Sequence, residues 1–477
     1  MRNFLRKMRG GFGFAAPAVE QHGHAQRRSR RVMSGAISAF VARALTTIVS
    51  VAVVPLTLGY LGSERYGIWV TIATTLALLN FIDFGLEDSL TNALGSAFGR
   101  DAHDVARRYV SSAFSAFCLV SVALLAIGSP CIPRVAAFLF PQSSPELMQR
   151  EIVPAIFIAF GFFALRFPLL ITGRVLAAYQ ENFLANIWSI AGSIANLVAV
   201  LAVIWFHGGL PWLVIGSSGV GFVISIISAI WLFGLRRPWL RPRFAAFDGT
   251  ILKQLFSSGW KFFIVGALWL LNTESDTVII SHFLGATQVT VFNVTFQLFT
   301  ITMVVQRLVM PSLWPAYTEA YTRHDFAWMR RAFRTNARLS FFTTGILSLI
   351  FICFGQQIIR LWAGESAVPP VALLLWMGIW NLLLAQLHAF GTLLNALARL
   401  RVRLICGPIT ALLNILLSVL LVRRFGVAGV TAATVVAFLL ADYVPLRMQI
   451  LGIFREFRVR EKAVPAGKLA TAPSVSA

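Results

Sequence analysis

The chain has 477 residues, of which 57% are hydrophobic and only 13% are charged. Its mean hydropathy of +0.76 excludes an ordinary soluble enzyme, because a chain so rich in apolar side chains would not stay dissolved in water. The 41 Lys and Arg residues exceed the 19 Asp and Glu residues, and the net charge is +22. In a soluble protein such a charge would indicate nucleic acid. Here the cations flank long apolar segments, so we expect contact with the lipid bilayer and its anionic headgroups, and no nucleic acid.

About twelve apolar segments are long enough to cross a bilayer as helices, which takes about 20 residues each. The strands of a β-barrel would alternate over about ten residues, whereas these segments are continuously apolar. In chain order they cover residues 34–58, 66–86, 109–129, 152–171, 183–205, 210–233, 256–283, 287–311, 337–362, 370–397, 404–422 and 427–453. The sequence therefore predicts an all-α membrane protein.

Charged tails precede and follow these spans. Residues 1–32 lack the apolar stretch of a signal peptide, and we expect a disordered basic tail, with Met33 as an alternative start. Residues 454–477 form a second charged tail. Of the 41 cations, 31 lie in the two tails and in alternate loops, and six lie in the other loops. By the positive-inside rule, this distribution predicts that both termini are cytoplasmic.

The chain also repeats itself. Residues 173–208 align without gaps to residues 391–426. The clearest pairs are Gly173 with Gly391, Asn196 with Asn414, and Leu61-Gly62 with Leu284-Gly285. Chance similarity between apolar segments is the alternative. A duplication of six spans predicts two lobes related by a pseudo-two-fold axis along the membrane normal. We expect an N-lobe at 33–235, a cytoplasmic linker at 236–255, a C-lobe at 256–453 and a cavity between the lobes.

Four cations lie inside the predicted spans, where a charge is costly and marks function. They are Arg43, Arg166, Lys261 and Arg307. Two structural alternatives remain. Lys261 is near the cytoplasmic end of its span and could reach the headgroups, and Arg307 could form an ion pair with Asp83.

Other polar side chains share single faces of spans. Trp269, Asn272 and Asp276 lie on the same side of the seventh span as Lys261. Asp83 lies on the polar side of the second span, and Thr300 lies on the polar side of the eighth span. A polar stripe on a spanning helix faces protein or water rather than lipid. Because the first, second, seventh and eighth spans are equivalent in the two repeats, this pattern predicts a substrate cavity.

No pattern of a soluble enzyme is present in the sequence. We find no P-loop, no HExxH, no GxSxG and no paired CxxC. The four cysteines are far apart and predict neither a metal site nor a disulfide framework. The longest outside loop, near residues 130–151, is too short for a catalytic domain. We therefore expect a protein that is not an enzyme and holds no metal.

At LGYLGSERYGIWVTIATTLALLNFIDFGLEDSL (residues 58–90) the chain resembles the polysaccharide exporters and O-antigen flippases of the multidrug/oligosaccharidyl-lipid/polysaccharide (MOP) superfamily. The likeness continues in TVIISHFLG (277–285) and RRFGVAGVTAATVV (423–436). It implies a MATE/MOP-like fold with a V-shaped cavity between two six-helix lobes. It also implies that a polyprenyl-pyrophosphate-linked oligosaccharide moves from the cytoplasmic to the periplasmic leaflet of a bacterial inner membrane. Polysaccharide polymerase and chain-length machinery are the expected protein partners.

The intramembrane residues suit that substrate. A pyrophosphate cannot cross a bilayer unpaired, and Arg offers a permanently charged fork for phosphate. The expected pyrophosphate ligands are Arg43, Arg166, Lys261 and Arg307, and the expected sugar ligands are Trp269, Asn272 and Thr300. Asp83 and Asp276 are candidates for coupling to a proton or sodium gradient, unless they only neutralise a nearby cation. No other cofactor is expected.

Three classes of alternative remain. A lipid II flippase normally has two additional spans, and a multidrug exporter of the same superfamily would require an anionic cavity. A major-facilitator symporter would carry a Gly-x-x-x-Asp-Arg loop order, which GSAFGRDAHDVARR (residues 95–108) does not give. A polysaccharide polymerase or ligase, an enzyme, would carry a large periplasmic loop.

Overall fold

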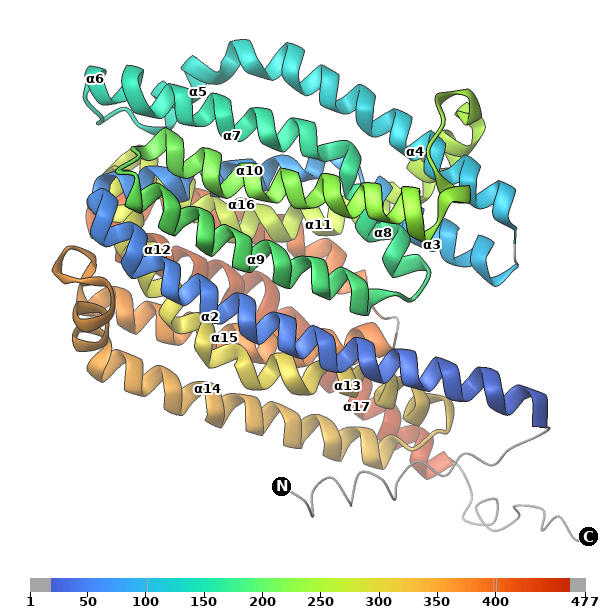
Figure 1. Cartoon of the computed structure of the whole chain (residues 1–477). Helices are drawn as coiled ribbons and strands as arrows, with labels where there is room; N and C mark the ends of the chain where they lie inside the picture. The colour runs from blue at the N-terminus through green and yellow to red at the C-terminus, as the bar shows by residue number, and fades with distance from the viewer. Residues whose placement is uncertain (1–18, 101, 398, 400, 464–477) are drawn as a thin grey trace, which may run out of the picture.

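The computed structural model describes residues 19–100, 102–397, 399 and 401–463, and its elements are helices joined by short turns (Figure 1). The N-terminal half contains α2 (Val19–Leu78), α3 (Leu86–Gly99), α4 (His103–Ala123), α5 (Ile132–Leu139), α6 (Pro145–Leu147), α7 (Val153–Arg166), α8 (Ile171–Ala178), α9 (Asn182–Trp205) and α10 (Leu210–Ile230). The C-terminal half contains α11 (Gly249–Leu284), α12 (Ala286–Thr300), α13 (Val304–Thr322), α14 (Phe326–Ala363), α15 (Val371–Ala396), α16 (Arg401–Phe438) and α17 (Val444–Ala463). The prediction of an all-α membrane protein is confirmed.

Long helices cross the molecule from one end to the other. Within the described chain, eight helices are long and apolar enough to span a membrane, judged by length and composition. Two of them, Val41–Leu78 and Arg401–Val459, each extend over two predicted spans. Each of these two contains one glycine with non-helical backbone angles, Gly62 or Gly426, at the boundary between its spans. The chain therefore turns at the glycine, and each long element comprises two spanning helices.

The two halves turn in the same way at equivalent positions. Gly62 has φ 76° and ψ 169°, and Gly285 has φ 86° and ψ 170°. Only glycine adopts such a conformation without strain. Helix α2 packs against α9, and α11 packs against α16. The predicted pairing of Leu61-Gly62 with Leu284-Gly285 is thus matched by the backbone, as expected of two duplicated lobes.

Both tails are partly helical. Helix α2 begins at Val19, inside the predicted tail, while residues 1–18 lie outside the described part of the chain. Helix α17 continues to Ala463, beyond the predicted end of the last span, and residues 464–477 are not described. Phe457 stacks on Phe326 with ring centroids 4.4 Å apart, and Phe454 packs on Phe333 at 5.3 Å. This aromatic packing on α14 explains why the helix extends into the charged segment.

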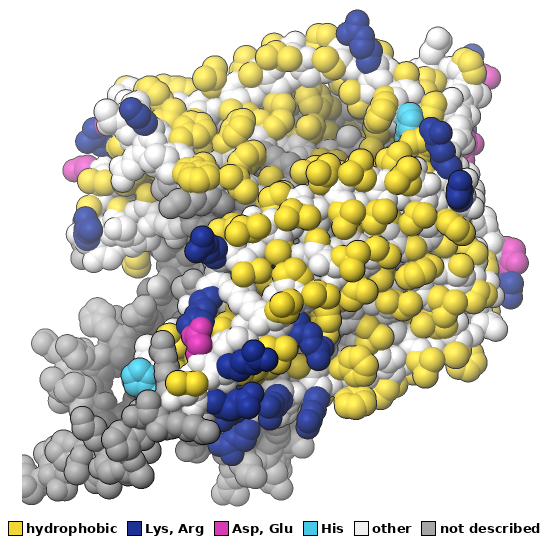
Figure 2. Space-filling view, turned by 180° about the vertical axis from the view of Figure 1, so that it is seen from behind, with side chains coloured by type: hydrophobic (Ala, Val, Ile, Leu, Met, Phe, Trp, Pro, Cys, Tyr) yellow, Lys and Arg dark blue, Asp and Glu magenta, His cyan; other side chains and the backbone are white. Residues whose placement is uncertain are grey.

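The molecule has two different ends. We call the end at which α2 begins and α17 ends the basic end, because exposed arginines of the described chain gather there (Figure 2). They include Arg100, Arg108, Arg236, Arg331, Arg334, Arg338 and Arg455. The opposite end, called the far end, carries the turns at Gly62, Gly285, Gly364 and Gly426.

Apolar side chains fill both lobes. Two cores lie in the N-lobe, one around Ile68 and Phe160 and the other around Leu90 and Phe117. A single large core fills the C-lobe, and it also includes Val54, Leu58 and Tyr66 of α2. Helix α2 therefore contributes to the packing of both lobes near the far end.

Candidate functional site

A buried carboxylate lies in the last third of α11. Asp276 is only 6% exposed. Its carboxylate accepts a hydrogen bond from the Thr434 hydroxyl at 2.8 Å and faces the Asn414 amide at 3.5 Å, both on α16. Within the described part of the chain, no ion pair to Asp276 is found. A buried charge without a partner is costly, so the carboxylate is a site that could take up a proton or a cation.

A cavity of about 170 Å³ opens beside this carboxylate. Polar residues from α11, α12, α15 and α16 line it, with aromatic rings on one side. The polar lining includes Asn272, Thr273, Asp276, Thr300, Asn381, His388, Thr431 and Thr434, and the aromatic side chains are Phe292, Phe296 and Trp380. At about 30 Å³ per water molecule, the volume holds about six waters.

Among the described residues, two oxygen atoms in this lining have no hydrogen-bond partner. They are the buried Asn272 Oδ1 and Thr431 Oγ1. The Asn272 amide nitrogen donates to the Leu268 carbonyl at 2.8 Å, so the amide oxygen of Asn272 points away from that carbonyl. Carboxylate, amide and hydroxyl oxygens are the donors that hard cations prefer. The cavity therefore has the size and the chemistry for a proton or a small cation.

The structure brings three predicted residues together. Asn272, Thr300 and Asp276 line the same cavity. This cavity lies inside the C-lobe, however, and not between the lobes. Its volume suits a small occupant, and sugar binding by Asn272 and Thr300 stays a prediction. Thr300, the last residue of α12, also donates to the Gln297 carbonyl at 2.7 Å.

The second predicted coupling residue, Asp83, lies elsewhere. It ends the short turn η1 (Leu79–Asp83) between α2 and α3. Its carboxylate accepts the Gly85 amide at 3.1 Å and the Glu87 amide at 3.5 Å. These contacts satisfy the free N–H groups at the start of α3, so the geometry assigns Asp83 to the turn.

The predicted pyrophosphate ligands divide into two pairs. Arg43 of α2 and Arg166 at the end of α7 both expose their side chains. The Arg166 Nε donates to the Ser225 hydroxyl of α10 at 3.0 Å, which orients its guanidinium. Lys261 and Arg307 belong to α11 and α13, but their side chains lie outside the described residues, as does that of Trp269.

Several lining residues escaped the sequence analysis. Asn381, Thr431 and Thr434 come from spans in which no polar stripe was recognised. One signal was present: Asn414 is among the few polar residues shared by the two repeats, and it contacts Asp276. The segment 423–436, noted for its family likeness, also contains both threonines.

Duplicated lobes of spanning helices, with a polar cavity in one of them, define a membrane transporter of the MOP superfamily. An inward-facing multidrug resistance MATE family transporter has the same fold, with a TM-score of 0.69 and 14% identity over 87% of this chain and 95% of that structure. A MOP superfamily transporter from Pyrococcus furiosus aligns with a TM-score of 0.62 and 14% identity over 91% of this chain and 96% of its own.

Residues 32–320 match the family model described as polysaccharide biosynthesis protein, and residues 263–420 match the MatE model. Since the first match covers more than half of the chain, the chain belongs to the polysaccharide biosynthesis protein family. A putative O-antigen export protein from Yersinia pseudotuberculosis is 20% identical over 85% of this chain and 92% of its own length. A putative O-antigen transporter from Salmonella typhi is 20% identical over 86% and 93%.

Proposed function

We propose that this transporter is a flippase for polyprenyl-pyrophosphate-linked oligosaccharide repeat units in the synthesis of O-antigen, capsule or exopolysaccharide. The observation that carries the proposal is the likeness, over most of both chains, to two relatives named for O-antigen export. The charges of the N-lobe support it, because a pyrophosphate needs cationic partners within the membrane.

The headgroup would meet arginines in the N-lobe. Arg43 of α2 and Arg166 of α7 are exposed residues. A guanidinium stays charged at any physiological pH and can bind two phosphate oxygens at once. Lys261 and Arg307, on α11 and α13 of the other lobe, complete the proposed set of headgroup ligands. The lipid tail remains in the bilayer throughout.

The energy would come from a cation gradient. We assign the proton or sodium ion to the cavity at Asp276, with the free oxygens of Asn272 and Thr431 beside it. Thr300 would take part in this cation site rather than in sugar binding. Binding of a proton or a cation neutralises the buried carboxylate. This change in charge can shift the equilibrium between the two conformations of a carrier.

The orientation follows from the arginines. We propose that the basic end faces the cytoplasm of a bacterial cell, so that both termini are cytoplasmic and the far end is periplasmic. The polymerase and chain-length machinery that receive the glycan would then act next to the far end.

A leaflet-resolved assay tests the proposed function. In a strain that lacks this protein, lipid-linked repeat units should accumulate on the cytoplasmic face of the inner membrane. Unpolymerised units already on the periplasmic face would instead indicate a polymerase. Arg43→Ala, Lys261→Ala and Arg307→Ala should each lower the periplasmic fraction in a complemented strain.

A matched control separates these cations from general charge effects. Arg150 lies at the far end with a side chain 79% exposed, so Arg150→Ala removes an arginine outside the proposed path. It should complement fully. Full export by all three intramembrane variants would exclude the cationic mechanism.

A further inference from the structure

The glycines of the Tyr66-Gly67 and Asp83-Phe84-Gly85 motifs lie where the two lobes touch backbone to backbone. A Cβ atom added to Gly67 of α2 would lie 1.8 Å from the Ala286 carbonyl oxygen at the start of α12. Real Cβ atoms do not approach an oxygen so closely, so a side chain at this position must separate the two helices. The contact is near the far end, beside the turns at Gly62 and Gly285.

Single hydrogen bonds surround the Gly67 contact. The Thr290 hydroxyl of α12 donates to the Ser63 carbonyl, and the Tyr66 hydroxyl donates to Asn293 at 3.3 Å. On the other side of α11, Ser281 donates to the Leu139 carbonyl at 2.8 Å, and Gln142 donates to the Phe283 carbonyl at 2.9 Å. Each such bond contributes about 1 kcal/mol net. The lobes are therefore held closed at the far end by contacts that can be released one by one.

The second contact, near the basic end, is built differently. Gly85 has φ 73°, and a Cβ on it would lie 2.1 Å from the Gly259 carbonyl oxygen of α11. A Cβ on Gly259 would in turn lie 2.7 Å from the Gly85 carbonyl oxygen. Phe84 packs against Phe263 and Phe256, with ring centroids 5.4 and 6.3 Å apart. Apolar packing thus reinforces the glycine pair.

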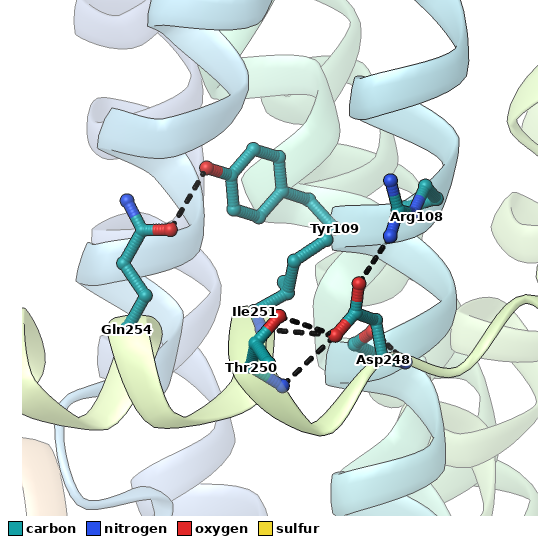
Figure 3. Close-up of polar contacts among 7 residues, drawn as sticks. Arg108, Tyr109, Asp248, Thr250, Ile251 and Gln254 are labelled. Carbon is teal, nitrogen blue, oxygen red and sulfur yellow. Dashed lines mark hydrogen bonds and ion pairs between the residues drawn. The ribbon is translucent and has the colours of Figure 1, made fainter.

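Polar contacts fix the first turns of α11 to the N-lobe (Figure 3). Asp248, the N-cap of α11, forms an ion pair with Arg108 of α4, and its amide donates to the Ser112 hydroxyl at 3.0 Å. Tyr109 donates to Gln254 one turn further along. Yet the same helix is bonded to the C-lobe through Asp276 and Thr434 at 2.8 Å. Helix α11 is therefore bonded to the N-lobe near its start and to the C-lobe at Asp276.

We propose that the two motif glycines have distinct tasks in the transport cycle: Gly67 against Ala286 is a seal that opens at the far end, and Gly85 against Gly259 is a pivot that stays in contact. The inference holds for any cargo, so it stands apart from the proposed substrate. It explains why these glycines lie at the two ends of the second span: both lobes need close approach at two points and free rotation between them.

Distances between spin labels test the proposal. Labels at Arg150 and Glu365, in the two lobes at the far end, replace side chains that are 79% and 74% exposed. The background would lack the four native cysteines. With Gly67→Val the distance distribution should shift to longer values, because the seal cannot close. With Gly259→Ala export should fall while this distribution stays unchanged, because only the pivot is disturbed.

The chain offers matched controls. A Cβ on Gly59 of α2 or on Gly95 of α3 would meet nothing within 4 Å, so Gly59→Ala and Gly95→Ala should leave the distances and export unchanged. A distribution in Gly67→Val equal to that of Gly59→Ala would overturn the seal. A far-end opening in Gly259→Ala as large as in Gly67→Val would overturn the pivot.

A second measurement applies if Gly67→Val is not recovered from membranes. A disulfide between Ser63→Cys and Thr290→Cys would close the seal covalently. Export should stop on oxidation and return on reduction. Unchanged export by the cross-linked protein would contradict a seal that opens.

Discussion

The two lobes contain similar segments of sequence but differ at the centre of their cores. In the C-lobe, Asn414 bonds with Asp276, Thr434 and Ser418. The spacing that pairs Asn196 with Asn414 pairs Gly216 with Thr434 and Val200 with Ser418, and the spacing that pairs Gly62 with Gly285 pairs Val53 with Asp276. The N-lobe thus keeps the asparagine and has apolar or small residues in the three other places.

The difference shows in the hydrogen bonding. Asn196 Oδ1 is buried and has no partner within the described part of the chain, whereas Asn414 Oδ1 accepts from Ser418 at 3.2 Å. Each lobe carries two cations in its predicted spans, Arg43 and Arg166 in one and Lys261 and Arg307 in the other. The buried acid and its polar partners, by contrast, are present in the C-lobe alone among these equivalent positions.

Among the substitutions that follow from this difference, replacement of Asp276 should have the largest effect. Asp276→Asn keeps the shape and one acceptor oxygen but removes the charge, so export should fall by about tenfold or more if this residue carries the ion. The protein should remain as stable as wild type, because a buried carboxylate without a cation is costly. Export in a complemented deletion strain and thermal unfolding in detergent measure the two effects. Glu274→Gln, on the same helix, is the control, and wild-type export by Asp276→Asn would rule out coupling at this residue.

Leucine substitutions at Asn196 and Asn414 should affect the stability of the protein differently. Asn414→Leu removes a partner from Asp276, Thr434 and Ser418 and should destabilise the protein by about 1–3 kcal/mol. Asn196→Leu removes an oxygen that has no partner, so stability should be unchanged or higher. Melting temperatures of the two variants, measured side by side, test this. Equal losses in both would mean that the N-lobe asparagine has a partner in the membrane after all.

The smallest effect is expected where the linker joins the lobes. Hydrogen bonds from the Thr250 side chain and amide, then from the Ile251 amide, and the charge of Arg108 lower the pKa of Asp248 from 3.8 to about 2. Because the pKa in the folded protein is depressed, this stabilisation is complete above pH 4 and is lost as the pH falls towards about 2. Asp248→Asn should lower the melting temperature slightly at pH 7 and flatten its slope between pH 4 and 2. An unchanged slope would show that other titratable groups cause the pH dependence of the melting temperature.

The sequence alone allowed part of the site to be predicted. Helical periodicity correctly placed Asn272 and Asp276 on one side of a span, because side chains a turn apart share a face. The same reasoning grouped Asp83 with the cavity, although its carboxylate caps a turn. Periodicity shows which residues share a helix face, but not where a helix ends, and α2 ends at Leu78, five residues before Asp83.

The sequence by itself determined the spanning helices, the duplication and the two turns at Gly62 and Gly285, since apolar length and the special backbone of glycine are local properties. The tertiary structure alone decided that the cavity lies within the C-lobe, that Thr434 meets Asp276 from 158 residues away, and that Gly67 and Gly85 touch the opposite lobe. Those contacts join distant segments, and no pattern within one helix specifies which face of another helix it will meet.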